Sequence, residues 1–261
     1  MLLLDGTEVA PETPLLRADD LGVVRGEAVF ETLRVVDGRP HGLARHLSRM
    51  AASAARLAME LPDGFEALAL KAAVGVADAG LRLTWTKGSP SHPGTGFAVV
   101  FDVAPETVAG RRGITVVTLP LGVSSTVRAQ QPWLLGGVKS TSYAVNMAAG
   151  RHAHELGADD AIWVSTDGFV LEAPTSTVLA RVDGGWVTPP VEAGILPGTT
   201  LLAVQDLVPV TTRPLRVDEL TAEVCLLSSV RGVAPVTALD GRALPVDREL
   251  GAAFEASLRS A

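Results

Sequence analysis

Residues 136–143 read Gly136-Gly137-Val138-Lys139-Ser140-Thr141-Ser142-Tyr143 and contain one of only three lysines in a chain that has nineteen arginines. An arginine guanidinium stays charged in a protein, whereas a buried lysine amine can become neutral and attack a carbonyl group. In a sequence this rich in arginine, a lysine is expected where a reactive amine is needed. The alternative is that the lysine lies at the surface by chance. The residues around Lys139 have to decide between these two interpretations.

The composition is that of a globular protein. Hydrophobic residues make up 47% and charged residues 20% of the 261 residues. The net charge of −7 argues against nucleic acid or an anionic membrane surface as the main partner. Cys225 is the single cysteine, so no intrachain disulfide can form, and no run of about 18 apolar residues predicts a membrane span. We expect a soluble cytoplasmic protein and predict no metal site.

Hydrophobic periodicity predicts two α/β domains, at residues 1–103 and 114–261, with residues 104–113 as a polar, turn-rich linker. The predicted elements of the first domain are a strand at 29–36, helices at 43–57 and 66–79, and strands at 81–86 and 96–103. Those of the second are strands at 114–119, 161–164, 169–171, 177–182 and 224–228, and helices from just after Lys139 to about 156, at 199–208 and at 248–258.

Three features beyond Lys139 bear on its chemistry. Glu172 follows the apolar residues 169–171, where its carboxylate can point into a cleft and keep a ring nitrogen protonated; a surface charge on an edge strand is the alternative. The turn at 194–198 leads into a helix, whose first unpaired N–H groups suit a phosphate, with an ordinary N-cap at Thr199 as the alternative. Ser229 adds a small hydroxyl just after a buried strand.

Taken in order, these features make the chain similar to the class IV aminotransferases, the fold-type IV pyridoxal-phosphate enzymes. That family includes branched-chain aminotransferases, D-amino-acid transaminases and aminodeoxychorismate lyases. The resemblance covers almost the whole chain, and the runs that carry it are Arg25–Arg34, His46–Met50, Val138–Ser140, Asp167–Glu172, Leu196–Thr200, and Ser228–Ser229 with Pro235–Val236. Any one run alone would be weak, whereas the ordered set is specific.

The resemblance implies a mixed α/β (α+β) fold, with an N-terminal α/β sandwich domain and a C-terminal pseudo-barrel α/β domain that binds the cofactor. It also implies a homodimer, in which loops of one subunit close the pocket of the other. The apolar loop residues Trp133, Leu134 and Leu135 are candidate contributors to that interface.

Carried over by position, the resemblance implies that Lys139 forms the internal aldimine with pyridoxal 5'-phosphate and moves the proton, and that Glu172 pairs with the pyridine nitrogen. The other implied cofactor-binding residues are Arg49, Thr199, Thr200 and Ser229, on the phosphate, and Tyr143, which either hydrogen-bonds the phenolic oxygen or packs in the core. Two positions depart from the family: Thr177 stands where Asn is usual, and Leu201 where Arg is usual. Both put the finer cofactor contacts in doubt.

The candidate substrate-binding residues are Phe30, Arg34, Lys87, His92 and Arg231. Phe30 occupies the position of a tyrosine in D-amino-acid transaminases, and the loop that contains Lys87 and His92 lacks their arginine. These two residues are candidate replacements, with a plain exposed loop as the alternative. Arg34 and Arg231 are candidate partners of the substrate carboxylate, with a surface charge as the alternative for Arg231.

The resemblance is closest to the D-amino-acid transaminase and aminodeoxychorismate lyase side of the family. We predict transamination between an amino acid, with a D-amino acid favoured, and a 2-keto acid. The lyase reaction, which forms 4-aminobenzoate and pyruvate, is the close alternative because it uses the same residues. A third alternative, a homologue that binds pyridoxal phosphate without turnover, would predict loss of Lys139 or Glu172, and both are present.

Overall fold

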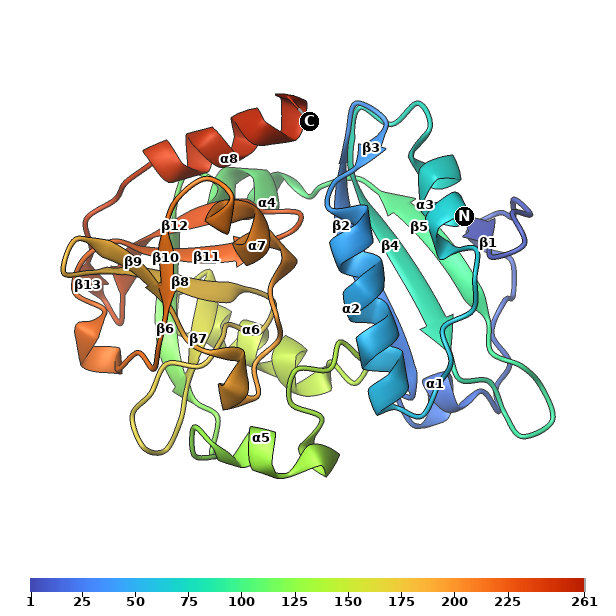
Figure 1. Cartoon of the computed structure of the whole chain (residues 1–261), viewed down its shortest axis with the longest axis horizontal. Helices are drawn as coiled ribbons and strands as arrows, with labels where there is room; N and C mark the ends of the chain where they lie inside the picture. The colour runs from blue at the N-terminus through green and yellow to red at the C-terminus, as the bar shows by residue number, and fades with distance from the viewer. Residues whose placement is uncertain (261) are drawn as a thin grey trace. The chain divides into compact units, whose positions relative to one another are not determined.

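The computed structural model describes residues 1–260, which form two compact units (Figure 1). Unit 1 comprises Met1–Val103 and Val138–Tyr143, and unit 2 comprises Ala104–Gly137 and the chain from Ala144 onward. The segment that carries Lys139 thus groups with the first unit, although it lies within the second domain predicted from the sequence. The stretch predicted as a linker contains helix α4 (Pro105–Gly110). Pro105 favours this helix start because its missing N–H would have no partner in the first turn anyway.

Unit 1 is an antiparallel sheet covered on one face by helices. The sheet order is β1-β5-β4-β2-β3, and β2 pairs with β4 along its whole length. The strands are β1 (Leu2–Leu3), β2 (Ala28–Val36), β3 (Arg39–Pro40), β4 (Asp78–Thr86) and β5 (Gly96–Phe101); the helices are α1 (Leu21–Val24), α2 (Leu43–Arg56) and α3 (Phe65–Ala73). Alternate residues of β2, such as Leu33, pack with Met50 of α2 and Leu68 of α3 in one core.

One helix of unit 1 is shorter than predicted. The sequence predicts a helix over 66–79, but α3 ends at Ala73 and β4 begins at Asp78. The reason lies at Gly75, which has a φ of +76° and so turns the chain out of the helix. The predicted strand at 29–36 and the predicted helix at 43–57 are confirmed within a residue or so at each end.

Unit 2 is built on a mixed sheet in the order β10-β9-β8-β11-β12-β6-β7, with β13 paired to β12. Its strands are β6 (Ile114–Pro120), β7 (Asp160–Val164), β8 (Thr177–Val182), β9 (Gly185–Thr188), β10 (Val210–Thr212), β11 (Val224–Ser228), β12 (Gly232–Leu239) and β13 (Arg242–Ala243). The helices besides α4 are α5 (Val127–Gln130), α6 (Ala144–Glu155), α7 (Thr199–Gln205) and α8 (Glu249–Ser260), with 3-10 turns η1 (Pro132–Leu134), η2 (Val191–Ala193) and η3 (Val217–Glu219). The core includes Ile162, Val178 and Leu226.

Residues 169–171 do not form the predicted strand. Val170 makes a single bridge to Val164, and Phe169 a single bridge to Arg216. The chain turns back tightly here, because the Ser165 amide and hydroxyl both donate to the Phe169 carbonyl. No helix among residues 1–260 is long and apolar enough to cross a membrane.

The packing of α2 and α3 on β2 can be tested at Leu33, which is fully buried. Leu33→Ala is expected to lower the free energy of unfolding by about 2–5 kcal/mol, because the cavity it leaves cannot close completely. Urea denaturation measures the change. Leu70→Ala, at an exposed position of α3, is the matched control and should differ from the parent by no more than about 0.5 kcal/mol. Equal stability of the two variants would contradict this core assignment.

Candidate active site

The Lys139 segment lies along the open edge of β2. The Phe30 amide donates a hydrogen bond to the Lys139 carbonyl at 3.2 Å, and the Thr141 amide donates to the Ala28 carbonyl at 2.9 Å. Strand β3 leaves this edge available because it pairs only with the far end of β2. The backbone of Lys139 is therefore fixed by unit 1.

The Lys139 amine is surrounded by two aromatic side chains of the same unit. Its Nζ lies 4.4 Å from the centroid of the Phe30 ring and 3.4 Å from the Tyr143 hydroxyl. The two rings meet edge to face, with centroids 5.1 Å apart. Ring faces attract a cationic amine, and the hydroxyl gives it a hydrogen-bond partner. Three residues that the sequence analysis selected separately are thus neighbours.

Arg49 belongs to a buried charge cluster under α2. Both Arg49 Nε and Nη2 donate to the Glu31 carboxylate at 2.7 Å. His46 Nδ1 lies 2.6 Å from the same carboxylate, whose side chain is completely buried. Glu31 is on β2 and the other two residues are on α2, so the cluster joins the helix to the strand. The sequence analysis selected Arg49 but not its two partners, although both lie in runs that carry the resemblance.

The charges in this cluster are set by competing effects. Burial alone would raise the pKa of Glu31, but hydrogen bonds from Arg49 and His46 outweigh it and lower that pKa to about 2. Burial lowers the pKa of His46, and the Glu31 hydrogen bond only partly opposes it. At neutral pH the cluster therefore holds an ionised carboxylate and a neutral imidazole that donates from Nδ1.

Arg34 is placed differently from its predicted role. It is buried, and its Nε and Nη2 donate to the Asp78 carboxylate at 2.9 and 2.7 Å. It also lies roughly 13 Å along β2 from Phe30, given a rise of about 3.3 Å per residue. The geometry favours a structural ion pair between β2 and β4 over the predicted contact with a substrate carboxylate.

The loop that contains Lys87 and His92 is tied down at its start. Lys87 Nζ pairs with the Glu27 carboxylate and donates to the Leu57 carbonyl at 2.9 Å. His92 is exposed, and its Nδ1 contacts the Ser91 carbonyl. The Lys87 amine is therefore already bound to partners within unit 1.

Asp20 organises this loop and is not among the residues predicted from the sequence. Its Oδ1 accepts hydrogen bonds from the amides of Gly22 at 2.7 Å and Gly88 at 3.2 Å, and its Oδ2 accepts from the Thr86 hydroxyl at 2.6 Å. Asp20 is also the N-cap of α1. A capping Asp ahead of a short helix is detectable in a sequence, but its partners 66 to 68 residues away are not.

In unit 2, both carboxylate oxygens of Glu172 have defined partners. Arg128 Nη1 donates to Oε1 at 3.0 Å, and the Leu196 amide donates to Oε2 at 2.9 Å. The predicted ring-nitrogen partner is thereby joined to the turn ahead of α7. The backbone at residue 194 can pass close to Arg128 because this residue is glycine. A Cβ atom at position 194 would lie 2.5 Å from the Arg128 Cβ. No periodic pattern in the loop between β6 and Lys139 singles out Arg128.

The predicted phosphate-binding residues of unit 2 also gather. Thr199 and Thr200 are buried at the start of α7, and the Thr199 hydroxyl lies 3.5 Å from that of Ser229. The turn before them passes close to Thr177, since a Cβ on Gly198 would lie 2.2 Å from the Thr177 hydroxyl oxygen. Leu201, which stands where the family usually has Arg, is buried in α7.

Arg231 does not offer its guanidinium to solvent. Its Nη2 donates to Asp160 at 2.7 Å and to the Ser176 hydroxyl at 3.0 Å. The side chain is only 15% exposed. This geometry favours a structural role, joining the start of β7 to the loop before β8, over the predicted substrate contact.

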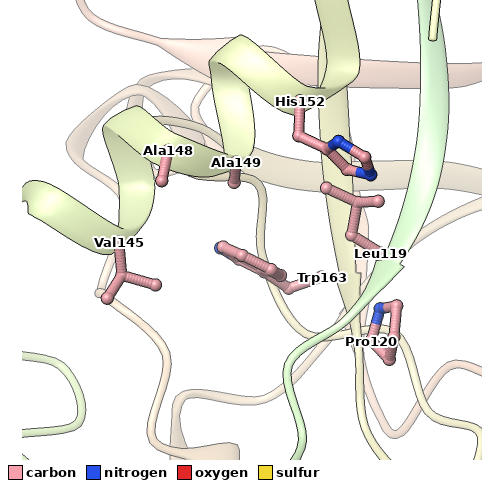
Figure 2. Close-up of a pocket in the computed structure, with 7 residues that line it drawn as sticks. All are labelled: Leu119, Pro120, Val145, Ala148, Ala149, His152 and Trp163. Carbon is pink, nitrogen blue, oxygen red and sulfur yellow. The ribbon is translucent and has the colours of Figure 1, made fainter. Parts of the chain in front are cut away.

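A cavity of about 410 Å³ in unit 2 is separate from these groups (Figure 2). Val145, Ala148, Ala149 and His152 of α6 line one side, and Leu119, Pro120 and Trp163 of β6 and β7 line the other. Figure 2 shows the Trp163 ring beneath the helix. The lining is largely apolar and contains none of the predicted site residues.

The donor groups fit pyridoxal phosphate chemically. Unit 1 carries a primary amine at Lys139, which suits an aldehyde, and a guanidinium at Arg49, which suits a phosphate. Unit 2 carries a carboxyl group at Glu172, which is hydrogen-bonded to Arg128, and the neighbouring hydroxyls of Thr199 and Ser229. These are the groups that the cofactor's aldehyde, phosphate and ring nitrogen require.

Comparison with known proteins identifies the family. The model of the class IV amino-transferases matches residues 28–239, and the chain therefore belongs to this family of pyridoxal-phosphate-dependent enzymes. The chain is 39% identical to the bifunctional aminodeoxychorismate lyase / D-amino acid transaminase of Mycobacterium tuberculosis, over 94% of this chain and 93% of that protein.

Solved structures show the same fold. A fold IV-transaminase from Curtobacterium pusillum is 41% identical, with a TM-score of 0.90, over 96% of this chain and 89% of its own. The pyridoxal-phosphate-bound form of an aminotransferase described as hypothetical, from Mycobacterium tuberculosis, is 36% identical, with a TM-score of 0.94, over 99% and 98% of the two chains. The mixed α/β fold of fold-type IV and the cofactor predicted from the sequence are thereby confirmed.

The buried cluster makes an acid-stability prediction. The folded-state pKa of Glu31 is about 2, below the ordinary value of 4.5, so its contribution is complete above about pH 4.5 and is lost as the pH falls toward 2. Glu31→Gln should lower the free energy of unfolding at pH 7 by about 3–5 kcal/mol, because Arg49 loses its buried counter-charge. It should also flatten the loss of stability below pH 4.5. Urea denaturation over a pH series measures both effects.

The control for this experiment is Glu66→Gln, which makes the same chemical change at an exposed position of α3. It should leave both the stability at pH 7 and its acid dependence close to those of the parent. An acid dependence that is the same in Glu31→Gln as in the control would contradict the pairing described for Glu31.

Proposed function

We propose that the protein is a D-amino-acid transaminase that moves an amino group from a D-amino acid to a 2-keto acid. The observation that carries this proposal is the Lys139 amine, fixed on the edge of β2 beside Phe30 and the Tyr143 hydroxyl. The name of the Mycobacterium tuberculosis relative, which includes D-amino acid transaminase, supports the choice of substrate class.

Lys139, Glu172 and Arg128 each have a distinct task in this proposal. Bound pyridoxal phosphate withdraws electrons from the substrate and so makes its Cα–H bond acidic. Lys139, with its amine neutral, would take the Cα proton of the substrate and hold that proton for its return. Glu172 would pair with the ring nitrogen, and the hydrogen bond from Arg128 would orient its carboxylate.

Each unit carries donor groups that suit a phosphate. Arg49 would supply the charge, and its bidentate pairing with Glu31 would hold the guanidinium in one orientation. Thr199, Thr200 and Ser229 would supply hydroxyl groups. Fixed donors of this kind bind a dianion without having to reorganise when it arrives.

Aminodeoxychorismate lyase activity is a second candidate, favoured by the bifunctional name of the same relative. Chemically it needs no further group. When the substrate carries a leaving group next to the carbon that loses its proton, the electron pair can expel that group in place of reprotonation. The amine of Lys139 and the carboxylate of Glu172 serve both outcomes.

We also propose that the enzyme is a cytoplasmic homodimer. The exposed Trp133 and Leu134 support an interface, because large apolar side chains at a surface usually mark a contact with another protein.

Burial raises the pKa of the lone Cys225 to about 12, so this thiol is unreactive. A chain without disulfides suits a reducing compartment, which supports the cytoplasmic location.

Lys139→Ala tests the assignment of the reactive amine. The variant should lose the visible absorption band of bound pyridoxal phosphate and all measurable transamination, because the other two lysines are engaged elsewhere. Lys71 Nζ donates to the Gly6 carbonyl, and Lys87 Nζ donates to the Leu57 carbonyl. Its thermal unfolding without cofactor should stay close to that of the parent, since the backbone contacts of residue 139 remain. Retained turnover would overturn the assignment.

The substrate class is tested by adding D-alanine, L-leucine and aminodeoxychorismate separately to the purified, cofactor-loaded enzyme. We expect D-alanine to bleach the visible band toward the pyridoxamine form and to yield pyruvate, while L-leucine leaves the band unchanged. Release of 4-aminobenzoate and pyruvate from aminodeoxychorismate without bleaching would show the lyase. Bleaching by L-leucine alone would contradict the D-amino-acid proposal.

A further inference from the structure

The backbone of Lys139 is held at both of its polar groups, by two different elements of unit 1. Its carbonyl accepts a hydrogen bond from the Phe30 amide of β2 at 3.2 Å. Its amide donates to the hydroxyl of Ser53, on α2, at 3.1 Å. Ser53 and Lys139 are 86 residues apart in the sequence, so only the fold brings them together.

Ser53 is an unusual residue for its position. It lies in the interior of α2 and is 2% exposed. Alanine would be the better helix former there and would avoid burying a hydroxyl group. Helix stability alone therefore does not account for a serine, whereas the hydrogen bond accepted from Lys139 does.

The acceptor is itself fixed in place by the buried charge cluster. His46, Arg49 and Ser53 recur at intervals of three or four residues, so they lie along one face of α2. The first two bind the Glu31 carboxylate, which belongs to β2. Glu31 follows directly after Phe30, the residue that holds the Lys139 carbonyl. One strand therefore sets the position of both groups that contact the backbone of Lys139.

We propose that Ser53 is a positioning residue for the reaction: its hydroxyl fixes the backbone of Lys139 so that the amine meets the reacting carbon of the substrate. This inference rests on the proposed function. Without the Ser53 hydroxyl, the Lys139 amide loses its acceptor, and the backbone shifts to find another. The displacement is passed along the side chain to Nζ, whose distances to the Phe30 ring and the Tyr143 hydroxyl then change. Proton transfer is sensitive to such shifts because the reacting atoms must be aligned at close distance.

The test compares Ser53→Ala, Ser53→Thr and Ser48→Ala in the cofactor-loaded enzyme with D-alanine and 2-oxoglutarate. Ser53→Ala should lower kcat about 10-fold and change KM less than about 2-fold, because it affects the proton-transfer step. Ser53→Thr keeps the hydroxyl and should recover most of kcat. Ser48→Ala makes the same change at an exposed position of α2 and should match the parent.

Two measurements without substrate separate positioning from simple stability. The first is the pH midpoint at which the visible band of the bound cofactor changes, which should shift in Ser53→Ala and not in Ser48→Ala, because the surroundings of Lys139 Nζ have changed. The second is the rate at which borohydride fixes the cofactor on Lys139, followed by peptide mass; it should change in the same variant. A serine that only stabilised the helix would alter the melting temperature and leave both readouts unchanged.

The outcomes distinguish this inference from the proposed function. An active parent with a Ser53→Ala variant that has the same kcat, pH midpoint and fixation rate would overturn the positioning role and leave the transaminase proposal standing. A parent that binds the cofactor but does not turn over D-alanine would overturn the proposed substrate class. In that case the pH midpoint and the fixation rate still decide whether Ser53 positions Lys139.

Discussion

The carboxylate of Glu31 is the constraint on which the first unit depends. A buried carboxylate costs several kcal/mol unless charged or polar partners surround it, so the strand that carries it can pack only where those partners arrive. Helix α2 supplies them as Arg49 and His46. The pairing therefore sets the helix against β2 in one register, and the apolar contacts around Leu33 fill in behind it. Burying an ion pair seldom adds stability compared with an apolar pair. It does favour the one packing of α2 on β2 in which the Glu31 carboxylate keeps its partners.

Unit 2 uses a comparable device at Glu172. One carboxylate oxygen accepts from Arg128 in α5 and the other from the amide of Leu196 in the turn before α7. A single acidic side chain thus ties two loops to the end of a buried segment. Shifting either loop would leave a carboxylate oxygen without its donor, which is costly in a partly buried setting. The Thr199 hydroxyl, just after this turn, lies 3.5 Å from the hydroxyl of Ser229.

The long periodic elements could be predicted from the sequence because they depend on local patterns, and the candidate site residues could be selected from the ordered runs that mark the family. Strand β2, helix α2 and strand β11 follow from alternation or helical spacing, and Lys139 and Glu172 from their neighbours. What escaped prediction depends on partners far apart in the chain. Glu31, Ser53, Asp20 and Arg128 look ordinary in the sequence, and only the fold shows what they hold. The same reason explains why the partners of Arg34 and Arg231 were not foreseen: a guanidinium's counter-charge cannot be read from its neighbours in the sequence.

The placement of residues 138–143 has a consequence for synthesis on the ribosome. Residues 1–103 contain every strand and helix of unit 1, yet the strip that covers the open edge of β2 emerges only after 34 residues of unit 2 have been made. Until then the nascent sheet presents an unpaired amide at Phe30 and an unpaired carbonyl at Ala28, the kind of exposed edge that recruits other strands. The segment that completes the sheet also carries Lys139, so a chain released too early would lack both this amine and the protection of that edge.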